Sequence, residues 1–202
     1  MSDMILRASL TSPFGRKPRL AAAVAGLSDR VEVVMADTFD DSDSLRTQNP
    51  LGKVPTLVLA DGSTLYDSRV ILEYFDYLAG GDRIIPIEPA ARFAALKLQA
   101  LGDGILDAGV LRRLETLFRD ETLRSHRWLG YQSGKMARAL DVLEAAPPSD
   151  TDILVGEIAV ACGLGFIDFR LGDEWRAGRP RLAGWFERFG ERCPGFADTA
   201  PH

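Results

Sequence analysis

Apolar and polar positions follow two different patterns along the chain, one on each side of about residue 85. In the first part, short apolar or β-branched runs alternate with helical stretches. The runs predict strands at residues 4–9, 31–35, 56–60 and 63–66, and Asp61-Gly62 is a hairpin turn signal between the last two. Residues 16–26 predict a helix in which Pro18 is tolerated only near the start. An apolar stripe after Asp67-Ser68 predicts a second helix, so the order is βαβ followed by ββα.

Beyond a break marked by Gly80, Gly81, Pro86 and Pro89, only helical patterns occur. They predict helices at residues 90–124, 131–145, 158–171 and 180–192, the first with an interruption near its glycines, Gly102, Gly104 and Gly109. The strongly apolar stretch 158–171 is expected at the centre of this part. We therefore predict a mixed α/β domain at 1–80, a linker at 81–89 and an all-helical domain at 90–202.

The amino-acid composition and charge limit the kinds of function that the protein can have. The chain has 202 residues, 46% of them hydrophobic and 26% charged, with a net charge of −5. This balance is typical of a globular protein, and it excludes a broad basic face for nucleic acid. We find no membrane span, no secretory signal and no metal-ligand spacing. Cys162 and Cys193 are interpreted as structural thiols, and we expect a cytoplasmic protein.

The turn Ser12-Pro13-Phe14-Gly15 follows the first strand and places Ser12 at the start of a helix. Backbone N–H groups and the helix dipole favour a negative charge there. A thiol-disulfide oxidoreductase would carry cysteines at both ends of this turn, where this chain has Ser12 and Gly15. Ser12 therefore either only caps the helix or donates a hydrogen bond to the thiolate of a bound ligand. Thr11 is the alternative donor.

Residues 49–56, Asn-Pro-Leu-Gly-Lys-Val-Pro-Thr, precede the third strand. A proline directly before a strand removes a ladder donor. A cis bond at Val54-Pro55 would turn the Val54 backbone outward, where it can pair with an extended peptide. The other interpretation is an ordinary trans proline at a strand start.

Asp67-Ser68 begins the helix after the hairpin. The Ser68 hydroxyl and the N–H groups of the first turn can hold a carboxylate, and Asp67 can hold an ammonium group. Together they suit the head group of an amino acid, although a plain helix cap also explains the pair.

These three motifs, spaced about 40 and then 13 residues apart, resemble the glutathione site of the glutathione transferase superfamily, and the likeness extends over essentially the whole chain. The stretch from Pro180 to Pro194 is similar to that family's closing helix. The Ser-Pro-Phe turn resembles the serine-type members. The resemblance implies a thioredoxin-like domain that binds glutathione, followed by a helical domain that shapes the pocket of the second substrate.

The resemblance also implies roles for single residues. Ser12 would stabilise the glutathione thiolate, and Val54, before a cis Pro55, would clamp the cysteinyl part. The remaining glutathione-binding residues that it implies are Phe14 in the turn, Lys53 near a carboxylate, Asp67 and Ser68 at the γ-glutamyl head group, and Asp103 reaching that group across a dimer interface, with Asp107 close by.

The pocket of the second substrate would lie against the first long helix, where Leu111, Leu114 and Phe118 stand at helical spacing, although core packing also explains them. One departure from the family concerns its Ser/Thr-x-x-Asp capping box, because the matching stretch here is 159–162, Ala-Val-Ala-Cys. Glu157 is the nearby residue that would substitute.

The function implied is transfer of glutathione to small hydrophobic electrophiles by a homodimer, without a covalent enzyme intermediate. Glutathione-dependent peroxide reduction needs the same thiolate and is a second activity of this kind. The alternative is a non-catalytic, transferase-like protein with a binding or regulatory role.

Overall fold

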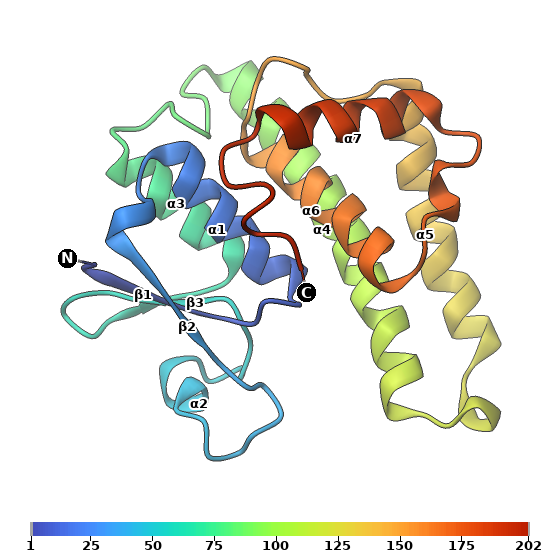
Figure 1. The fold of residues 1–202 in the computed structure, drawn as a ribbon, viewed down its shortest axis with the longest axis horizontal. Coiled ribbons are helices and arrows are strands. Elements are labelled where there is room, and N and C mark those ends of the chain that lie inside the picture. Colours follow the sequence, from blue (N-terminus) through green and yellow to red (C-terminus); the bar gives the residue numbers. More distant parts are fainter. Residues whose placement is uncertain (1, 202) are drawn as a thin grey trace. The chain divides into compact units, whose positions relative to one another are not determined.

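The computed structural model describes residues 2–201. It divides into two units (Figure 1). The first runs to Phe93 and also contains the stretch from Cys193 onward, and the second is Ala94–Arg192. This division differs from the boundary expected at residues 81–89. It falls inside a helix, and it joins the last residues of the chain to the first unit.

Four strands and three helices make up most of the first unit. The strands are β1 (Met4–Ala8), β2 (Val31–Met35), β3 (Thr56–Val58) and β4 (Thr64–Leu65). The helices are α1 (Pro13–Ala25), α2 (Leu45–Gln48) and α3 (Ser68–Leu78), with a 3₁₀ turn, η1, at Ser28–Arg30. The predicted βαβ-ββα order is confirmed, and the short helix α2 is an addition to it.

The sheet has the order β2-β1-β3-β4. β1 and β2 are parallel, with Met4 opposite Val31, because α1 forms the crossover between them. β3 is antiparallel to β1, with Leu6 opposite Leu57, and β4 is antiparallel to β3. This mixed sheet is that of a thioredoxin-like domain.

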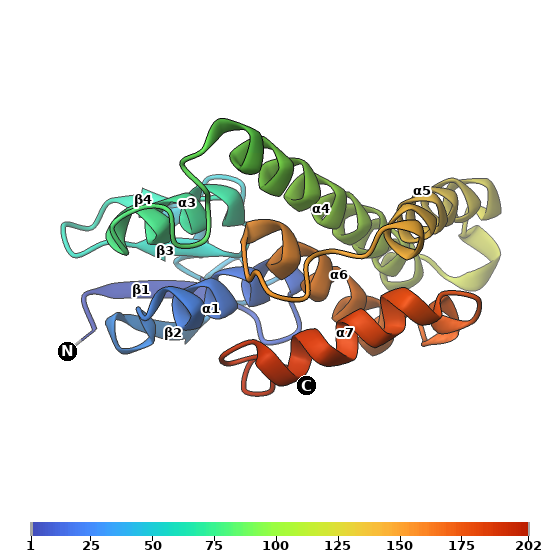
Figure 2. The same ribbon diagram turned by 90° about the horizontal axis from the view of Figure 1, so that it is seen from above.

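α1 and α3 pack against each other on one side of the sheet (Figures 1 and 2), and α2 lies on the other side (Figure 1). The core between them is apolar: Leu6, Leu20, Leu57, Leu72 and Phe75 are all fully buried. α1 begins earlier than the sequence pattern indicates, at Pro13, with Ser12 as its N-cap. Pro18 therefore lies in the second turn, where a missing N–H costs a hydrogen bond of the helix.

Residues after Cys193 lie along α1 of the first unit. The Arg16 guanidinium donates to the carbonyl oxygen of Phe196 at 2.8 Å and stacks 4.3 Å from the centre of its ring. Arg19 donates to the carbonyl oxygens of Asp198 and Thr199. These contacts explain why the end of the chain belongs to the first unit.

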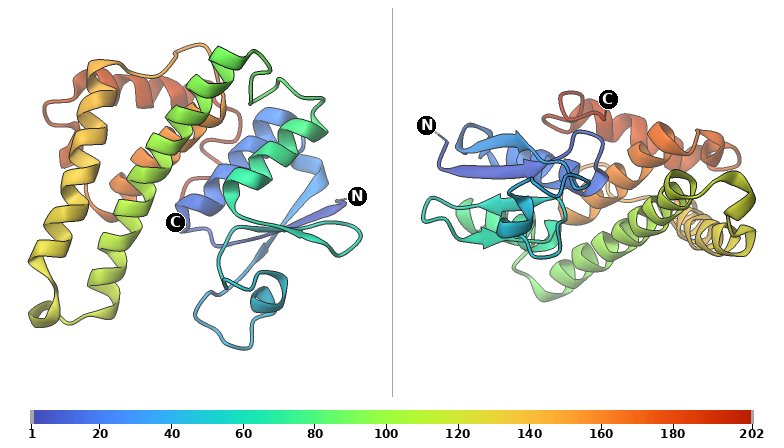
Figure 3. Two further views of the ribbon diagram at one scale, coloured as in Figure 1. Left: turned by 180° about the vertical axis from the view of Figure 1, so that it is seen from behind. Right: turned by 90° about the horizontal axis from the view of Figure 1, so that it is seen from below.

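The second unit is helical. It consists of most of α4 (Pro89–Phe118), α5 (His126–Ala145), α6 (Val155–Arg170) and α7 (Pro180–Arg192), with 3₁₀ turns η2 (Glu121–Leu123) and η3 (Glu174–Arg176). Among the described residues no strand follows residue 90, as predicted. Residues 119–125 join α4 and α5 into a helical hairpin (Figure 3).

α6 forms the centre of this unit, as its apolar sequence indicated. Every residue from Val155 to Ile167 is buried, Cys162 included. The predicted interruption of α4 at its glycines is wrong, because α4 is continuous. Gly102 serves packing instead: a Cβ there would lie 2.6 Å from the backbone carbon of Ala159, so glycine lets α4 and α6 approach closely.

The start of α6 corrects the expectation about its cap. The helix begins at Val155, so the stretch 159–162 lies in its second turn and not at its end. Glu157 supplies the cap: its Oε2 accepts the N–H of Leu154 at 3.1 Å. Leu154 has no side-chain oxygen to return the bond, so only half of a capping box is formed. Burial raises the pKa of the Glu157 carboxyl, and the backbone N–H groups around it partly offset this rise.

Candidate functional site

The three motifs found in the sequence come together at one edge of the sheet. β1 ends at Ala8, and residues 9–12 follow it directly. Because Arg7 is opposite Thr56 in the antiparallel register, the residues before β3 lie beside the end of β1. Leu65 is opposite Leu57, so the chain leaves β4 at this same edge and enters α3. The topology thus places the turn at Ser12, the Val54-Pro55 segment and the start of α3 next to one another.

Ser12 occupies the N-cap position of α1. Its Oγ accepts the N–H of Gly15 at 3.2 Å, which leaves the hydroxyl hydrogen for another acceptor. The Thr11 hydroxyl, the alternative donor, forms a hydrogen bond with the Ser9 hydroxyl at 3.2 Å, in which either atom can be the donor. The first turn of α1 contains no acidic residue. A thiolate beside Ser12 would therefore meet a hydroxyl donor and the positive end of a helix.

Asn49 organises the segment before β3. Its Nδ2 donates to the carbonyl oxygen of Lys53 at 2.9 Å and to Thr56 Oγ1 at 3.1 Å, while its Oδ1 accepts the N–H of Leu51 at 3.0 Å. Gly52 has a φ of +58°, a conformation that favours glycine. Asn49 is 1% exposed, so this bracing lies inside the protein. The motif contained Asn49, but its position in the sequence did not indicate this role.

The Val54-Pro55 peptide bond is cis, as predicted. Val54 is half-buried and Pro55 is buried. Within residues 2–201 no hydrogen bond uses the N–H or the C=O of Val54. The backbone of Val54 therefore keeps a donor and an acceptor for an extended ligand, which is what a peptide clamp requires.

The start of α3 carries the acid and the hydroxyl of the third motif. Asp67 is the N-cap, and its Oδ1 accepts the N–H of Arg69 at 2.9 Å. Capping uses only one carboxylate oxygen, so capping does not preclude contact with an ammonium group. Ser68 is buried, and its Oγ accepts a hydrogen bond from Lys17 Nζ at 3.1 Å. Sequence reasoning missed Lys17, because nothing in α1 alone shows that its side chain reaches α3.

Arg7 anchors the segment that leads to the second motif. Its guanidinium donates to Ser44 Oγ at 2.8 Å, to Gln48 Oε1 at 2.7 Å and to Asp43 Oδ1 at 2.8 Å. The N–H groups of Asp37 and Leu45, and then the guanidinium of Arg7, hold the pKa of the Asp43 carboxyl below its ordinary value. Buried Arg7 thus ties α2 to β1 and fixes where residues 49–55 begin.

Three further residues implied by the resemblance have different surroundings. Phe14 lies half-buried in the first turn of α1, and Lys53 is exposed before Val54. Asp103 lies on α4 in the helical unit and is only 1% exposed. The role across a dimer interface that the resemblance implies for Asp103 stays a prediction. Asp107, one turn further along α4, is exposed.

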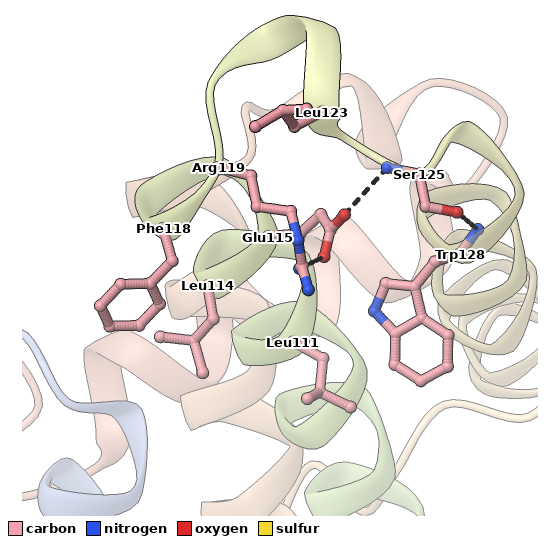
Figure 4. A pocket seen from close by; sticks show the side chains of 8 residues that line it. All are labelled: Leu111, Leu114, Glu115, Phe118, Arg119, Leu123, Ser125 and Trp128. Atoms are coloured by element: carbon pink, nitrogen blue, oxygen red, sulfur yellow. Dashed lines mark hydrogen bonds and ion pairs between the residues drawn. The ribbon is translucent and has the colours of Figure 1, made fainter.

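The helical unit contains a cavity of about 670 Å³ at the junction of α4, η2 and α5 (Figure 4). Leu111, Leu114 and Phe118, the residues expected to line the second-substrate pocket, are all in its wall. The complete lining is Leu111, Leu114, Glu115, Phe118, Arg119, Leu123, Ser125 and Trp128. Such a volume suits a small organic molecule.

The polar groups in this cavity are paired with one another. Glu115 is buried; one carboxylate oxygen accepts the N–H of Ser125 at 2.9 Å, and the other forms an ion pair with Arg119. The Ser125 hydroxyl caps α5 by accepting the N–H of Trp128 at 3.2 Å. The remaining lining residues are apolar or aromatic, so the cavity presents both polar and apolar groups to a ligand.

The described residues lack two further features. Between residues 2 and 201, no three His, Cys, Asp or Glu side chains cluster in a way that would hold a metal ion. In the same range, every helix is too short or too polar to cross a membrane.

The fold and the site define a class. A thioredoxin-like sheet carries a serine where an oxidoreductase of this fold would carry a reactive cysteine, and a helical unit follows it. Residues 11–78 match the family model described as "Glutathione S-transferase, N-terminal domain".

The chain is also similar to known proteins over nearly its whole length. It is 33% identical to the uncharacterized GST-like protein YibF of Escherichia coli K12, covering 98% of each chain. A glutathione transferase family member from Pseudomonas fluorescens Pf-5, solved with bound glutathione, is 39% identical at a TM-score of 0.93, covering 98% of this chain and 99% of that one. A glutathione S-transferase from Methylobacillus flagellatus KT, with glutathione bound, is 34% identical at a TM-score of 0.90, covering 98% and 100%. The protein belongs to the glutathione S-transferase superfamily.

Proposed function

We propose that the protein binds glutathione at the edge of the sheet and transfers its thiolate to small hydrophobic electrophiles. The observation that carries the proposal is the convergence of the Ser12 hydroxyl, the Val54 backbone and the Asp67-Ser68 pair at that edge. Two of the similar structures are described as containing bound glutathione, which supports the choice of ligand.

Each part of glutathione has a proposed partner. Ser12 donates to the thiolate, since its Oγ only accepts from the N–H of Gly15 and its hydroxyl hydrogen remains available. The Val54 N–H and C=O pair with the cysteinyl backbone, and exposed Lys53 lies near the glycyl carboxylate. Asp67 binds the γ-glutamyl ammonium, and Ser68 binds its carboxylate. Phe14 packs beside the thiol turn.

The chemical role of these residues is to hold and ionise a thiol that belongs to the ligand. Catalysis then comes from thiolate stabilisation and from placing the two reactants together, and no bond forms between enzyme and substrate. Reduction of a peroxide by the same thiolate is a second reaction available to this site. We propose the cavity at Leu111, Leu114 and Phe118 as the site of the electrophile, since these three apolar side chains are in its wall.

We further propose a cytoplasmic homodimer. Val70, Tyr74 and Tyr77 form a stripe at helical spacing on α3, and Tyr77 is 74% exposed. Phe93, in the second turn of α4, is also exposed. An uncovered aromatic stripe of this kind is typical of a protein interface. Sedimentation at micromolar concentration tests this: a dimer is expected, and a monomer alone contradicts it.

Binding and turnover are tested in sequence. Retention on glutathione-agarose, with elution by free glutathione, is expected if the site binds as proposed. Conjugation of a model aryl halide and reduction of an organic hydroperoxide then measure the two reactions. Binding without turnover of either substrate would favour the non-catalytic alternative, and absence of binding would refute the proposed site.

A further inference from the structure

A second hollow adjoins the cavity of the helical unit. It has a volume of about 300 Å³, and its walls are Ser125, Arg127, Trp128 and Tyr131. Ser125 and Trp128 also line the larger cavity, so the two spaces meet at the start of α5 (Figure 4). The rings of Trp128 and Tyr131 have their centres 6.1 Å apart. A ligand that extends from the larger cavity past Trp128 therefore enters a hollow with aromatic walls.

The walls of the two hollows contain one carboxylate and two guanidinium groups. Glu115 and Arg119 form an ion pair with each other, so together they contribute no net charge. Arg127 differs from them: it is exposed, and between residues 2 and 201 it has no ion pair and no hydrogen bond through its side chain. Within that range, the Arg127 guanidinium is a charge that no carboxylate in the walls compensates.

The surroundings of Arg127 also favour an anion. α5 begins at His126, with Ser125 as its N-cap, and its first turn contains no acidic residue. The positive end of the helix dipole therefore lies beside Arg127. Lys135 Nζ lies 4.4 Å from the centre of the Tyr131 ring, so a second cation stands beside this wall. A planar guanidinium can donate two parallel hydrogen bonds to a carboxylate, which makes a carboxylate its best-matched partner.

We propose that the electrophile carries a carboxylate, which Arg127 binds in the second hollow while the apolar part of the molecule lies against Leu111, Leu114 and Phe118. The inference rests on the proposed function and narrows its substrate class to hydrophobic electrophiles with an acidic end. For an aryl chloride, the glutathione sulfur forms a bond to the ring carbon, and chloride leaves with the electron pair of the broken C–Cl bond. Arg127 takes no part in this exchange and determines specificity.

Two aryl chlorides of nearly equal shape test the proposal. They are 4-chloro-3,5-dinitrobenzoate, an anion at neutral pH, and the neutral 4-chloro-3,5-dinitrobenzamide. KM and kcat are measured for each with glutathione at saturation, and each substrate is compared between variants, so its intrinsic reactivity cancels. Arg127→Met is expected to raise the KM for the benzoate by about three- to fivefold, the effect of a solvent-exposed ion pair, with kcat unchanged. The KM for the benzamide should not change.

Arg138→Met is the matched control. Arg138 is an exposed arginine of the same helix that lines neither hollow, so this change removes the same charge and should leave both KM values unaltered. Arg127→Lys keeps the charge and should retain most of the affinity for the benzoate. Arg127→Glu reverses the charge and should raise the KM for the benzoate further than Arg127→Met does. Added salt should weaken the parent's affinity for the benzoate alone.

The outcomes separate the two proposals. Equal effects of Arg127→Met on both substrates, or no effect on either, overturn the inference and leave conjugation by the protein standing. A parent that conjugates the benzamide but not the benzoate has the same meaning. A parent that conjugates neither substrate removes the proposed function and the inference with it. If circular dichroism shows that Arg127→Met does not fold, Arg127→Glu decides: a rise in KM confined to the benzoate supports the site, and a uniform rise or none overturns it.

Discussion

Ser12 caps α1 and is proposed to stabilise the thiolate, and two substitutions separate these roles. Its Oγ caps α1 through the N–H of Gly15, at 3.2 Å. Its hydroxyl hydrogen is proposed to stabilise the thiolate of bound glutathione. Ser12→Ala removes both interactions. Ser12→Gly also removes the hydroxyl, but glycine is tolerated at an N-cap far better than alanine is.

The expected magnitudes follow from these contacts. Alanine at the N-cap should lower the free energy of unfolding by about 1 kcal/mol, and glycine by only a few tenths. A hydrogen bond to a charged group contributes about 1.5–3 kcal/mol. One pKa unit corresponds to about 1.36 kcal/mol, so loss of the bond should raise the pKa of the bound thiol by about one to two units. Both variants should show this rise, although their stabilities differ.

The assay is a pH titration of the ultraviolet absorbance of the thiolate, with glutathione saturating each variant. Thermal or urea denaturation of the same variants reports the cap. Thr11→Val is the control, because Thr11 has its hydrogen bond to Ser9 and not to the backbone of α1. It should leave the thiol titration unchanged.

A titration of the Ser12→Gly protein that coincides with that of the parent would refute the role of Ser12. A shift in the Thr11→Val protein instead would identify Thr11 as the donor. If the rise in thiol pKa followed the loss of stability, and was larger in the Ser12→Ala protein than in the Ser12→Gly protein, the effect would come from the helix end and not from the hydroxyl.

Three other changes have defined outcomes. Asn49→Ala removes three hydrogen bonds of the loop before Val54, so it should lower stability by about 2–3 kcal/mol in urea denaturation and weaken glutathione in calorimetry; unchanged affinity would mean that the loop does not hold the clamp. Leu114→Trp fills part of the cavity and should raise the KM for the aryl halide without changing glutathione affinity; an unchanged KM would place the electrophile elsewhere. Folding raises the pKa of Glu157. At pH values between its pKa in the unfolded chain and its pKa in the folded protein, the folded protein therefore binds more protons, and its stability falls as pH rises through that window. Glu157→Gln keeps the acceptor for Leu154 and should gain stability relative to the parent across that window; a difference in melting temperature that is the same at every pH would contradict this.

Local patterns in the sequence were sufficient for most of the fold. Strand 31–35 and helix 180–192 have the bounds that their apolar spacing indicated. Helix 158–171 was correctly expected at the centre of the helical unit, because a helix that is apolar on every side must be buried. Gly102 shows where this reasoning fails. A glycine inside a helix signals either a break or a close approach, and only the position of Ala159, far along the chain, decides between them.

The site was predictable only in part, for the same reason. Ser12, Val54 and Asp67 stand in recognisable turns and caps, so their types and neighbours indicated chemistry. Asn49 and Lys17 act through side chains that reach backbone or hydroxyl groups brought close by folding. The contact from Lys17 to Ser68 crosses 51 positions of sequence, and no local periodicity records it.

The net charge of −5 describes the chain as a whole and not the groups near the proposed site, where Lys17, Lys53 and Asp67 lie. At physiological ionic strength, charges more than about 8 Å apart are largely screened from one another in solvent. A small anion at the edge of the sheet therefore responds to the helix ends and to the charges close to it more than to acidic residues spread over the surface. Overall acidity excludes an extended polyanion, which needs basic groups over a long face. It does not exclude glutathione, whose carboxylates and thiolate need positive potential only within a few ångströms.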